Sequence, residues 1–163
     1  MISKEEIEGS VRGKRAKELF LSGYNCSQSV FLAFKDLYDL DEKTALMISS
    51  SFGGGMGRLR EVCGSLSGAF LLAGILFGYS ETDNYKEKSK HYKRIQEIAC
   101  EFKELNGSII CRELLGLSDG SSNYKPSKRT KEYYKKRPCA DICMCSAAIM
   151  ERYIRDIKEQ EKL

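Results

Sequence analysis

Apolar side chains recur every three to four residues along most of the chain, which is the spacing of an amphipathic helix. No segment shows the strict alternation of a half-buried strand. The pattern predicts helices over residues 4–21, 26–38, 42–50, 62–79, 83–105 and 138–158, with a short helical segment over 111–115. We therefore expect an all-α fold, a compact helical bundle of about five to six helices.

Cap residues favour several of these boundaries. Asn25 and Asp41 are residue types that accept hydrogen bonds from the first turn of a helix, so they are expected to be N-caps. Gly23 and Gly107 are typical of the residues that end helices. Two glycines inside the first predicted segment weaken it, which allows that helix to form in two pieces.

The stretch over residues 62–79 is the most apolar in the chain. It approaches the length of a membrane span, but glycines and serines interrupt it, and it lacks the aromatic belts of a membrane protein. We expect no membrane span and predict the central, Gly-rich, buried helix of the bundle. Gly64 and Gly68 lie four residues apart, as do Gly74 and Gly78, which predicts close helix–helix contact inside the domain or across a homodimer.

The length and charge of the chain limit the number of domains and the kinds of partner that it suits. The chain has 163 residues, 42% apolar and 31% charged, which suits a single helical domain over 1–163. Residues 118–137 are expected to form a polar, basic connecting loop. The net charge of +4 is too small to indicate nucleic acid as a partner, and the basic run is more typical of a solvated surface. Residues 1–8 contain no apolar run of a secretory signal, so a cytoplasmic protein is expected.

The chain has seven cysteines and a single histidine, His91. Disulfides alone cannot pair an odd number, and a reducing compartment keeps thiols free, so the cysteines indicate metal binding or redox chemistry. Cys26, Cys63 and Cys139 fall at the starts of predicted helices. The unpaired N–H groups and the dipole of a helix N-terminus stabilise negative charge, so these thiols are expected to favour the thiolate. Each cysteine taken alone also suits the role of a small buried hydrophobe.

The last predicted helix carries three of the cysteines. Cys139 and Cys143 lie four residues apart on its apolar stripe, close enough to share a metal ion. Cys145 is expected well off the centre of that stripe. Cys143 and Cys145 are therefore candidate additional ligands. The preceding long helix is expected to bury a stripe that includes Tyr92 and to leave Cys100 as an exposed thiol without a role.

A glycine-rich break follows the third predicted helix, and its glycines are Gly53, Gly54, Gly55 and Gly57. Together with Arg58 this segment suits an anion, because glycines let backbone N–H groups approach a ligand and the arginine adds charge. It is not a Walker loop, because it lacks the Gly-Lys-Ser/Thr ending, and it is not a dinucleotide fingerprint, because no predicted strand precedes it. The favoured interpretation is that the glycines let the turn pass close to a cysteine pocket.

Five short motifs follow one another along the chain: GYNCSQSV at 23–30, FGGGMGR at 52–58, EVCGSLSGA at 61–69, GSIICRELLG at 107–116 and PC at 138–139. In this order they resemble the C_GCAxxG_C_C family, described as redox-active, over nearly the whole chain. The resemblance implies that four cysteines act together, namely Cys26, Cys63, Cys111 and Cys139. Ser65 stands where the central motif usually has alanine, a one-atom change.

The resemblance also carries an expectation about the cofactor. A related domain in split-Soret cytochrome c is associated with an iron–sulfur centre, which implies a helical domain that gathers four distant cysteines around a [2Fe–2S] or [4Fe–4S] cluster. It does not imply haem, because the chain has no Cys-x-x-Cys-His motif. Such a protein would exchange electrons with another electron carrier or with a transport system.

Two alternatives stay open. Four thiolates suit zinc as well as iron–sulfur clusters, which would make the chain a structural zinc-binding interaction module. Without metal, Cys63 would act as the nucleophile of a thiol–disulfide protein, resolved by another of the four cysteines. Arg112 is expected to pair with Glu113 or a neighbour on the bundle, or to supply charge beside an anionic cluster. The sequence does not decide whether the chain is an enzyme.

Overall fold

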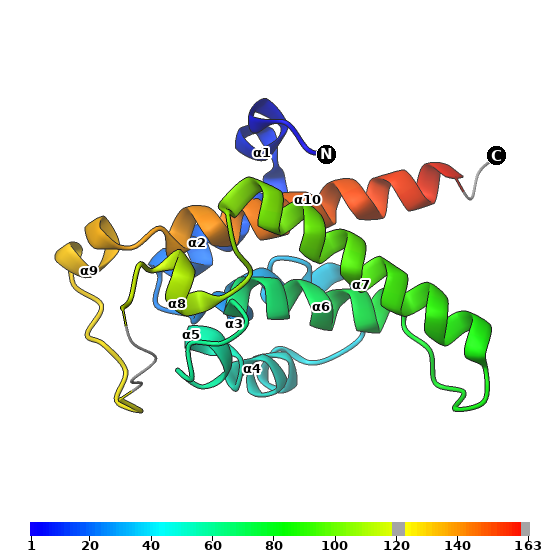
Figure 1. Ribbon diagram of the computed structural model, residues 1–163, viewed down its shortest axis with the longest axis horizontal. Coiled ribbons are helices and arrows are strands. Elements are labelled where there is room, and N and C mark those ends of the chain that lie inside the picture. The colour runs from blue at the N-terminus through cyan, green and yellow to red at the C-terminus, as the bar shows by residue number, and fades with distance from the viewer. Residues whose placement is uncertain (119–122, 161–163) are drawn as a thin grey trace.

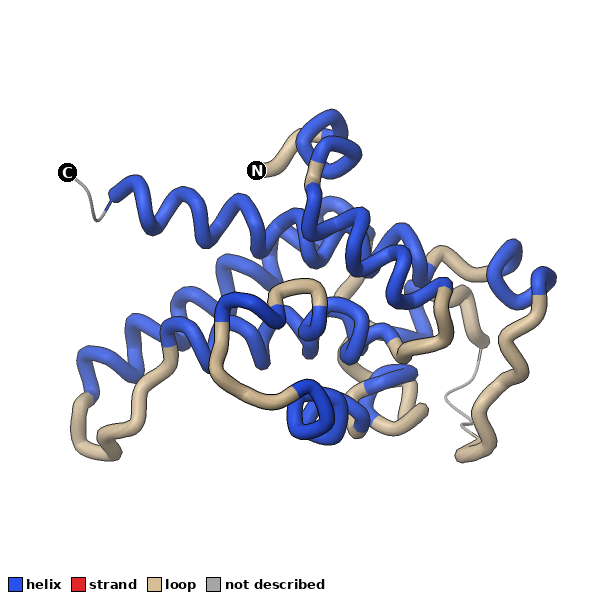
Figure 2. Tube along the Cα trace, turned by 180° about the vertical axis from the view of Figure 1, so that it is seen from behind, coloured by secondary structure: helices blue, strands red, loops and turns tan. Residues whose placement is uncertain are grey.

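The computed structural model describes residues 1–118 and 123–160, and within them the chain forms helices and loops without a strand (Figures 1 and 2). The helices are α1 Lys4–Gly9, α2 Val11–Leu21, α3 Cys26–Leu32, α4 Glu42–Ser50, α5 Gly53–Met56, α6 Gly64–Phe77, α7 Tyr85–Asn106, α8 Cys111–Leu114, α9 Lys131–Lys136 and α10 Cys139–Gln160. A 3-10 turn covers Lys35–Leu37. The all-α prediction is confirmed.

Helix α10 runs along the length of the molecule and packs against α2 on one side and α6 on another (Figure 1). Helix α3 packs along α6 and against α4, so α6 lies between α3, α7 and α10. The first turns of α6, from Gly64 to Ala69, are buried, because most of these residues are small and let neighbouring elements approach closely. The predicted central Gly-rich helix is therefore present, although its second half is only partly covered and Ile75 is 44% exposed.

The helix caps form as the sequence predicts. The Asn25 side chain accepts a hydrogen bond from the Gln28 amide at 2.9 Å, and the Gln28 side chain accepts one from the Asn25 amide at 3.1 Å. Asp41 caps α4, and Gly107, with φ 87°, ends α7. These caps fix where α3 and α4 begin, and α3 begins at Cys26.

Two predicted helices are interrupted. The segment over 4–21 breaks at Ser10, whose hydroxyl accepts a hydrogen bond from the Gly13 amide and so starts α2. The segment over 26–38 ends as an α-helix at Leu32 and continues as the 3-10 turn, so the prediction of one helix there was wrong. In this turn the Tyr38 ring stacks on Phe31, with the centroids 4.6 Å apart, and its hydroxyl donates to the Phe31 carbonyl. This packing replaces the last turn of the predicted helix.

The predicted connecting loop over 118–137 contains a helix, α9, which the sequence interpretation missed; residues 119–122 of that loop lie outside the described part of the chain. Thr130 caps α9, and the Tyr134 hydroxyl donates to the Leu21 carbonyl at 3.3 Å. The Tyr134 ring also meets Phe20 edge-on. This basic segment is therefore packed against the end of α2, not simply solvated.

The apolar stripe of α7 is shorter than predicted. Tyr92 is 51% exposed and meets Tyr79 edge-on, so it does not join the core. Ile98 and Phe102, further along the same helix, are buried as predicted. The first half of α7 instead buries Arg94, which lies over the Phe77 ring at 4.8 Å.

The spacing of small residues on α6 has two different outcomes. A Cβ on Gly68 would lie 2.6 Å from the Ser27 carbonyl oxygen, and one on Gly64 would overlap the Cys26 sulfur and the Phe52 carbonyl, so the first pair packs directly against α3 and its flanks. Gly74 has no neighbouring atom within 4 Å of its Cβ position in the described chain, and Gly78 lies beyond the helix end. The predicted close contact thus forms inside the chain for the first pair, whereas Gly74 makes no such contact within the described residues. Separately, none of the helices in the described part of the chain combines the length and apolarity needed to cross a membrane.

Candidate functional site

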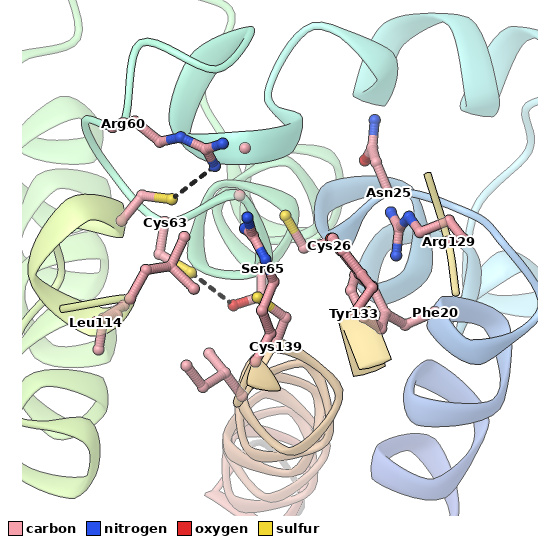
Figure 3. Close-up of a pocket in the computed structure, with 16 residues that line it drawn as sticks. Phe20, Asn25, Cys26, Arg60, Cys63, Ser65, Leu114, Arg129, Tyr133 and Cys139 are labelled. Carbon is pink, nitrogen blue, oxygen red and sulfur yellow. Dashed lines mark hydrogen bonds between the residues drawn. The ribbon is translucent and has the colours of Figure 1, made fainter. Parts of the chain in front are cut away.

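Four cysteines line one cavity of about 50 Å³ between the helices (Figure 3). Each lies at the N-terminus of a different helix: Cys26 begins α3, Cys63 caps α6, Cys111 begins α8 and Cys139 begins α10. Residues far apart in the sequence are therefore brought together by the way in which four helices start at the same place. We call this space the cysteine cavity.

A short antiparallel pairing of two extended segments positions Cys63 and Cys111. Val62 and Ile110 form an isolated bridge. The Cys63 amide donates to the Ile109 carbonyl at 2.8 Å, and the Cys111 amide donates to the Glu61 carbonyl at 2.6 Å. No alternating pattern in the sequence indicates this pairing, because it is only a few residues long.

The glycine-rich turn lies directly against the cysteines. Gly55 has φ 72°, and a Cβ at this position would lie 2.6 Å from the Cys111 Cβ. Gly54 and Gly57 also adopt positive φ, at 68° and 61°. A Cβ on Gly53 would lie 2.6 Å from the Asn25 side chain. The turn can take this path only because Gly53, Gly54 and Gly55 carry no side chains, which agrees with the interpretation of a turn that passes close to the cysteines.

Burial controls the protonation of the thiols. Desolvation raises the pKa of Cys63 and of Cys139 to about 12, and burial also raises the pKa of Cys26. The neighbouring cysteine sulfurs add to each shift, while the backbone N–H of Gly54 opposes it at Cys26. The expectation that these helix N-termini favour free thiolates was therefore wrong, because the cost of burying a charge exceeds the stabilisation from the helix end. In the absence of a ligand these thiols are protonated at neutral pH.

Arginines surround the same cavity. Arg60 is only 5% exposed, and its Nη1 donates to the Cys111 Sγ at 3.8 Å. Arg129 and Arg137 also line the cavity, and Figure 3 shows Arg60 and Arg129 on opposite sides of the cysteines. Ser65, which replaces the alanine usual in the motif, lies with its Oγ 3.2 Å from the Cys63 Sγ. None of the described residues that line the cavity is acidic.

A comparison with known protein families identifies the family of this chain. The family described as "Putative redox-active protein (C_GCAxxG_C_C)" matches residues 24–153. The chain belongs to the C_GCAxxG_C_C family. No curated protein and no solved structure matches it. The matched region begins just before Cys26 and ends after Cys139, so all four cysteines of the cavity lie within the C_GCAxxG_C_C segment.

The other three cysteines lie outside the cavity of this C_GCAxxG_C_C protein. Cys143 is fully buried one turn below Cys139, and its Sγ contacts the Cys26 carbonyl at 3.8 Å. Cys145, expected well off the centre of the apolar stripe, is also buried, with its Sγ 3.5 Å from the Asn106 Nδ2. It faces α7, which covers that side of α10. Cys100 is exposed as predicted, and all seven cysteines are free thiols.

Two of the arginines identified in the sequence have different surroundings. Arg112 does not line the cysteine cavity and pairs with Glu61 at 2.7 Å on the surface, which is a neighbour on the bundle, not Glu113. Arg58 does not line the cysteine cavity, and its Nε donates to the Asn123 carbonyl at 2.7 Å.

The sequence interpretation missed Arg60, Arg129 and Arg137 as residues of the cavity. The only local signal for Arg60 was its place two residues after Arg58, beside the glycine turn and before Cys63. Arg129 and Arg137 lie within the segment interpreted as a solvated loop, and nothing in their spacing connects them with residues a hundred positions earlier.

Proposed function

We propose that this C_GCAxxG_C_C protein transfers electrons through an iron–sulfur cluster held by Cys26, Cys63, Cys111 and Cys139. Four thiols around one cavity are the usual ligand set of such clusters. A redox-active role agrees with the description of the family. Its partner in this proposal is another electron carrier, and a compartment that keeps thiols reduced, such as the cytoplasm, suits seven free cysteines.

The observation that carries the proposal is the imbalance of charge around the cavity. With the thiols protonated, Arg60, Arg129 and Arg137 bring positive charge to a site whose described lining contains no carboxylate. Buried charge of one sign is costly unless a group of opposite sign compensates it. Four thiolates together with an iron–sulfur core carry net negative charge, so the residues present fit that group in both ligand chemistry and electrostatics.

The spacing of the ligands favours a cluster over a single zinc ion. Among the described residues, no three cysteine, histidine or acidic side chains lie close enough together to hold one metal ion. In a tetrahedral site with zinc–sulfur bonds of about 2.3 Å, the sulfurs would lie about 3.8 Å apart. A cluster spreads its cysteine ligands further apart around a larger core, and here the cysteines stand around a cavity of about 50 Å³. The zinc-binding module is therefore the weaker alternative.

When bound, an iron–sulfur cluster supplies one-electron chemistry. The residues of this chain would donate hydrogen bonds to the sulfur ligands of the cluster and limit the access of water to them. Arg60 donates toward the Cys111 sulfur and Ser65 lies against the Cys63 sulfur, and hydrogen bonds to ligand sulfurs favour the more negative, reduced state. Cys63 and Cys111 are each 7% exposed, so the packed helices keep most water from the sulfurs.

Metal-free thiol–disulfide exchange receives less support. The attacking group in that chemistry is a thiolate, and the thiol must be accessible to its substrate. Cys63, the nucleophile in that alternative, is almost completely buried and has its pKa raised to about 12. At neutral pH it would therefore be a very poor nucleophile.

The test is anaerobic purification followed by a visible absorption spectrum and analysis of iron, acid-labile sulfide and zinc. We expect a coloured protein with matched iron and sulfide, strongly reduced in Cys63→Ser. Cys100→Ser is the matched control, since Cys100 is exposed on α7 and does not line the cysteine cavity. Colourless protein without iron, or equal iron in Cys63→Ser and wild type, would contradict the proposal. One zinc per chain would support the structural alternative instead.

A further inference from the structure

A second cavity, of about 300 Å³, opens beside the cysteine cavity. The two cavities share the lining residues Asn25, Gly54, Arg60, Tyr133, Arg129 and Arg137. The larger cavity extends outward from them over the glycine-rich turn and the segment before α9. We call it the arginine vestibule, defined by Arg58, Arg60, Arg129 and Arg137.

The vestibule is strongly and exclusively positive. Four arginines line it, and none of its described lining residues is an aspartate or glutamate. Within residues 1–118 and 123–160, none of these four arginines forms an ion pair, although other arginines of the chain do. Burial lowers the pKa of Arg58, and the positive charges of Arg60 and Arg137 lower it further because like charges repel.

The guanidinium groups are held in place by packing. Arg129 lies over the Phe20 ring at 4.4 Å and over the Tyr133 ring at 4.8 Å, and Arg137 lies over the Tyr133 ring at 4.8 Å. Arg58 is fixed by its hydrogen bond to the Asn123 carbonyl. The Arg129 Nη1 is buried without a hydrogen-bond partner among the described residues. A fixed donor without an acceptor is unfavourable unless a ligand supplies the acceptor.

The depth of the arginines decides the size of the ligand. Arg60 is 5% exposed and lies at the junction of the two cavities, so the flat surface of an acidic protein would not reach it. A compact anion would fit a space of this volume and accept forked hydrogen bonds from several guanidinium groups. We propose that the arginine vestibule binds a small ligand that carries at least two negative charges on phosphate- or sulfate-type oxygens, and places it beside the cysteines. This inference goes beyond the proposed electron transfer and does not require a bound metal.

The test is calorimetric titration of the full-length protein with inorganic phosphate, sulfate and pyrophosphate, each at an ionic strength kept constant with chloride. We expect one saturable site per chain for at least one of these anions. Arg58→Gln and Arg137→Gln should each weaken the affinity about tenfold or more, since a hydrogen bond from a charged donor is removed. Arg15→Gln is the matched control, because it removes one positive charge from an exposed position on α2 outside the vestibule.

Circular dichroism of each variant confirms that the helices are intact before the affinities are compared. If a glutamine variant fails to fold, the lysine variant at the same position takes its place, and it should also bind more weakly because lysine lacks the forked geometry. The proposal is overturned if no anion saturates, if the vestibule variants bind as tightly as Arg15→Gln, or if an acidic peptide binds while the small anions do not. Repeating the titration on Cys63→Ser separates the two proposals, because anion binding should persist there even when the iron content is lost.

Discussion

The same substitution at two glycines of α6 should have opposite effects on stability. Gly68 lies against α3, where an added Cβ would be 2.6 Å from the Ser27 carbonyl oxygen and 3.2 Å from the Val30 Cβ. Gly74 lies on the same helix with no atom within 4 Å of the same position in the described chain. Ordinary van der Waals contact begins at about 3.4 Å, so alanine at 68 would force α3 away from α6 by several tenths of an ångström.

Two contributions to the free energy of unfolding decide the stability of these variants, a gain in helix propensity that both share and an overpacking cost that only one of them carries. Replacing glycine with alanine inside a helix stabilises it by up to about 1 kcal/mol, and this gain applies to both Gly68→Ala and Gly74→Ala. Overpacking of a tight helix contact costs about 1–3 kcal/mol, and this cost applies only at Gly68. The difference between the two variants is therefore about 1–3 kcal/mol. For a domain of this size, each kcal/mol corresponds to roughly 2–4 °C in melting temperature.

The assay is thermal unfolding followed by circular dichroism, with both variants and the wild type in the same buffer. We expect Gly74→Ala to melt at or above the wild type and Gly68→Ala to melt below it. Because α3 begins with Cys26, the displaced helix should also lower the iron content of Gly68→Ala under anaerobic purification. A melting temperature of Gly68→Ala equal to or above that of Gly74→Ala would refute the close helix contact.

Two further predictions concern ionisable groups. In the metal-free protein at pH 8, iodoacetamide should modify the exposed Cys100 well before Cys63, because burial raises the pKa of Cys63 to about 12 and leaves it protonated. Peptide mass spectrometry gives the order in which the two cysteines are labelled. Faster labelling of Cys63 would contradict its burial. Asp41→Ala should lower the melting temperature at pH 7 and have little effect near pH 2, because hydrogen bonds from the side chain and amide of Thr44 lower the pKa of Asp41. A group with a lowered folded-state pKa stabilises the fold above its unfolded pKa, about 3.9 for aspartate, and loses that contribution as the pH falls through its folded-state pKa. An equal drop in the melting temperature of Asp41→Ala at both pH values would show that the carboxylate charge does not matter.

Local signals in the sequence were reliable where the residue itself determines the backbone. Asp41 placed the start of α4, and Asn25 with Gln28 placed the start of α3, because a cap needs only residues within one helical turn. Glycine at 107 ended α7 for the same reason. The order of the motifs also singled out the four cysteines that line the cavity.

Signals that depend on distant neighbours failed. The segment over 131–136 looked like part of a polar loop, yet α9 forms there because its tyrosines and Arg129 pack on Phe20 and the end of α2. Tyr92 fits the apolar stripe of its helix, but it meets the ring of Tyr79 outside the core and stays exposed. Cys145 was placed off the stripe and is buried, because α7 covers a second side of α10.

The sequence by itself determined the helical class and most helix starts, since these follow from periodicity and caps, and its resemblance to the family singled out the four cysteines. The tertiary structure alone decided the chemistry around them. It brought Arg60 from the turn before α6, and Arg129 and Arg137 from the segment around α9, to the cysteines and left them without acidic partners in the described lining. It also reversed the expected preference for thiolates, because desolvation depends on how many atoms surround a sulfur, and no local pattern in the chain contains that information.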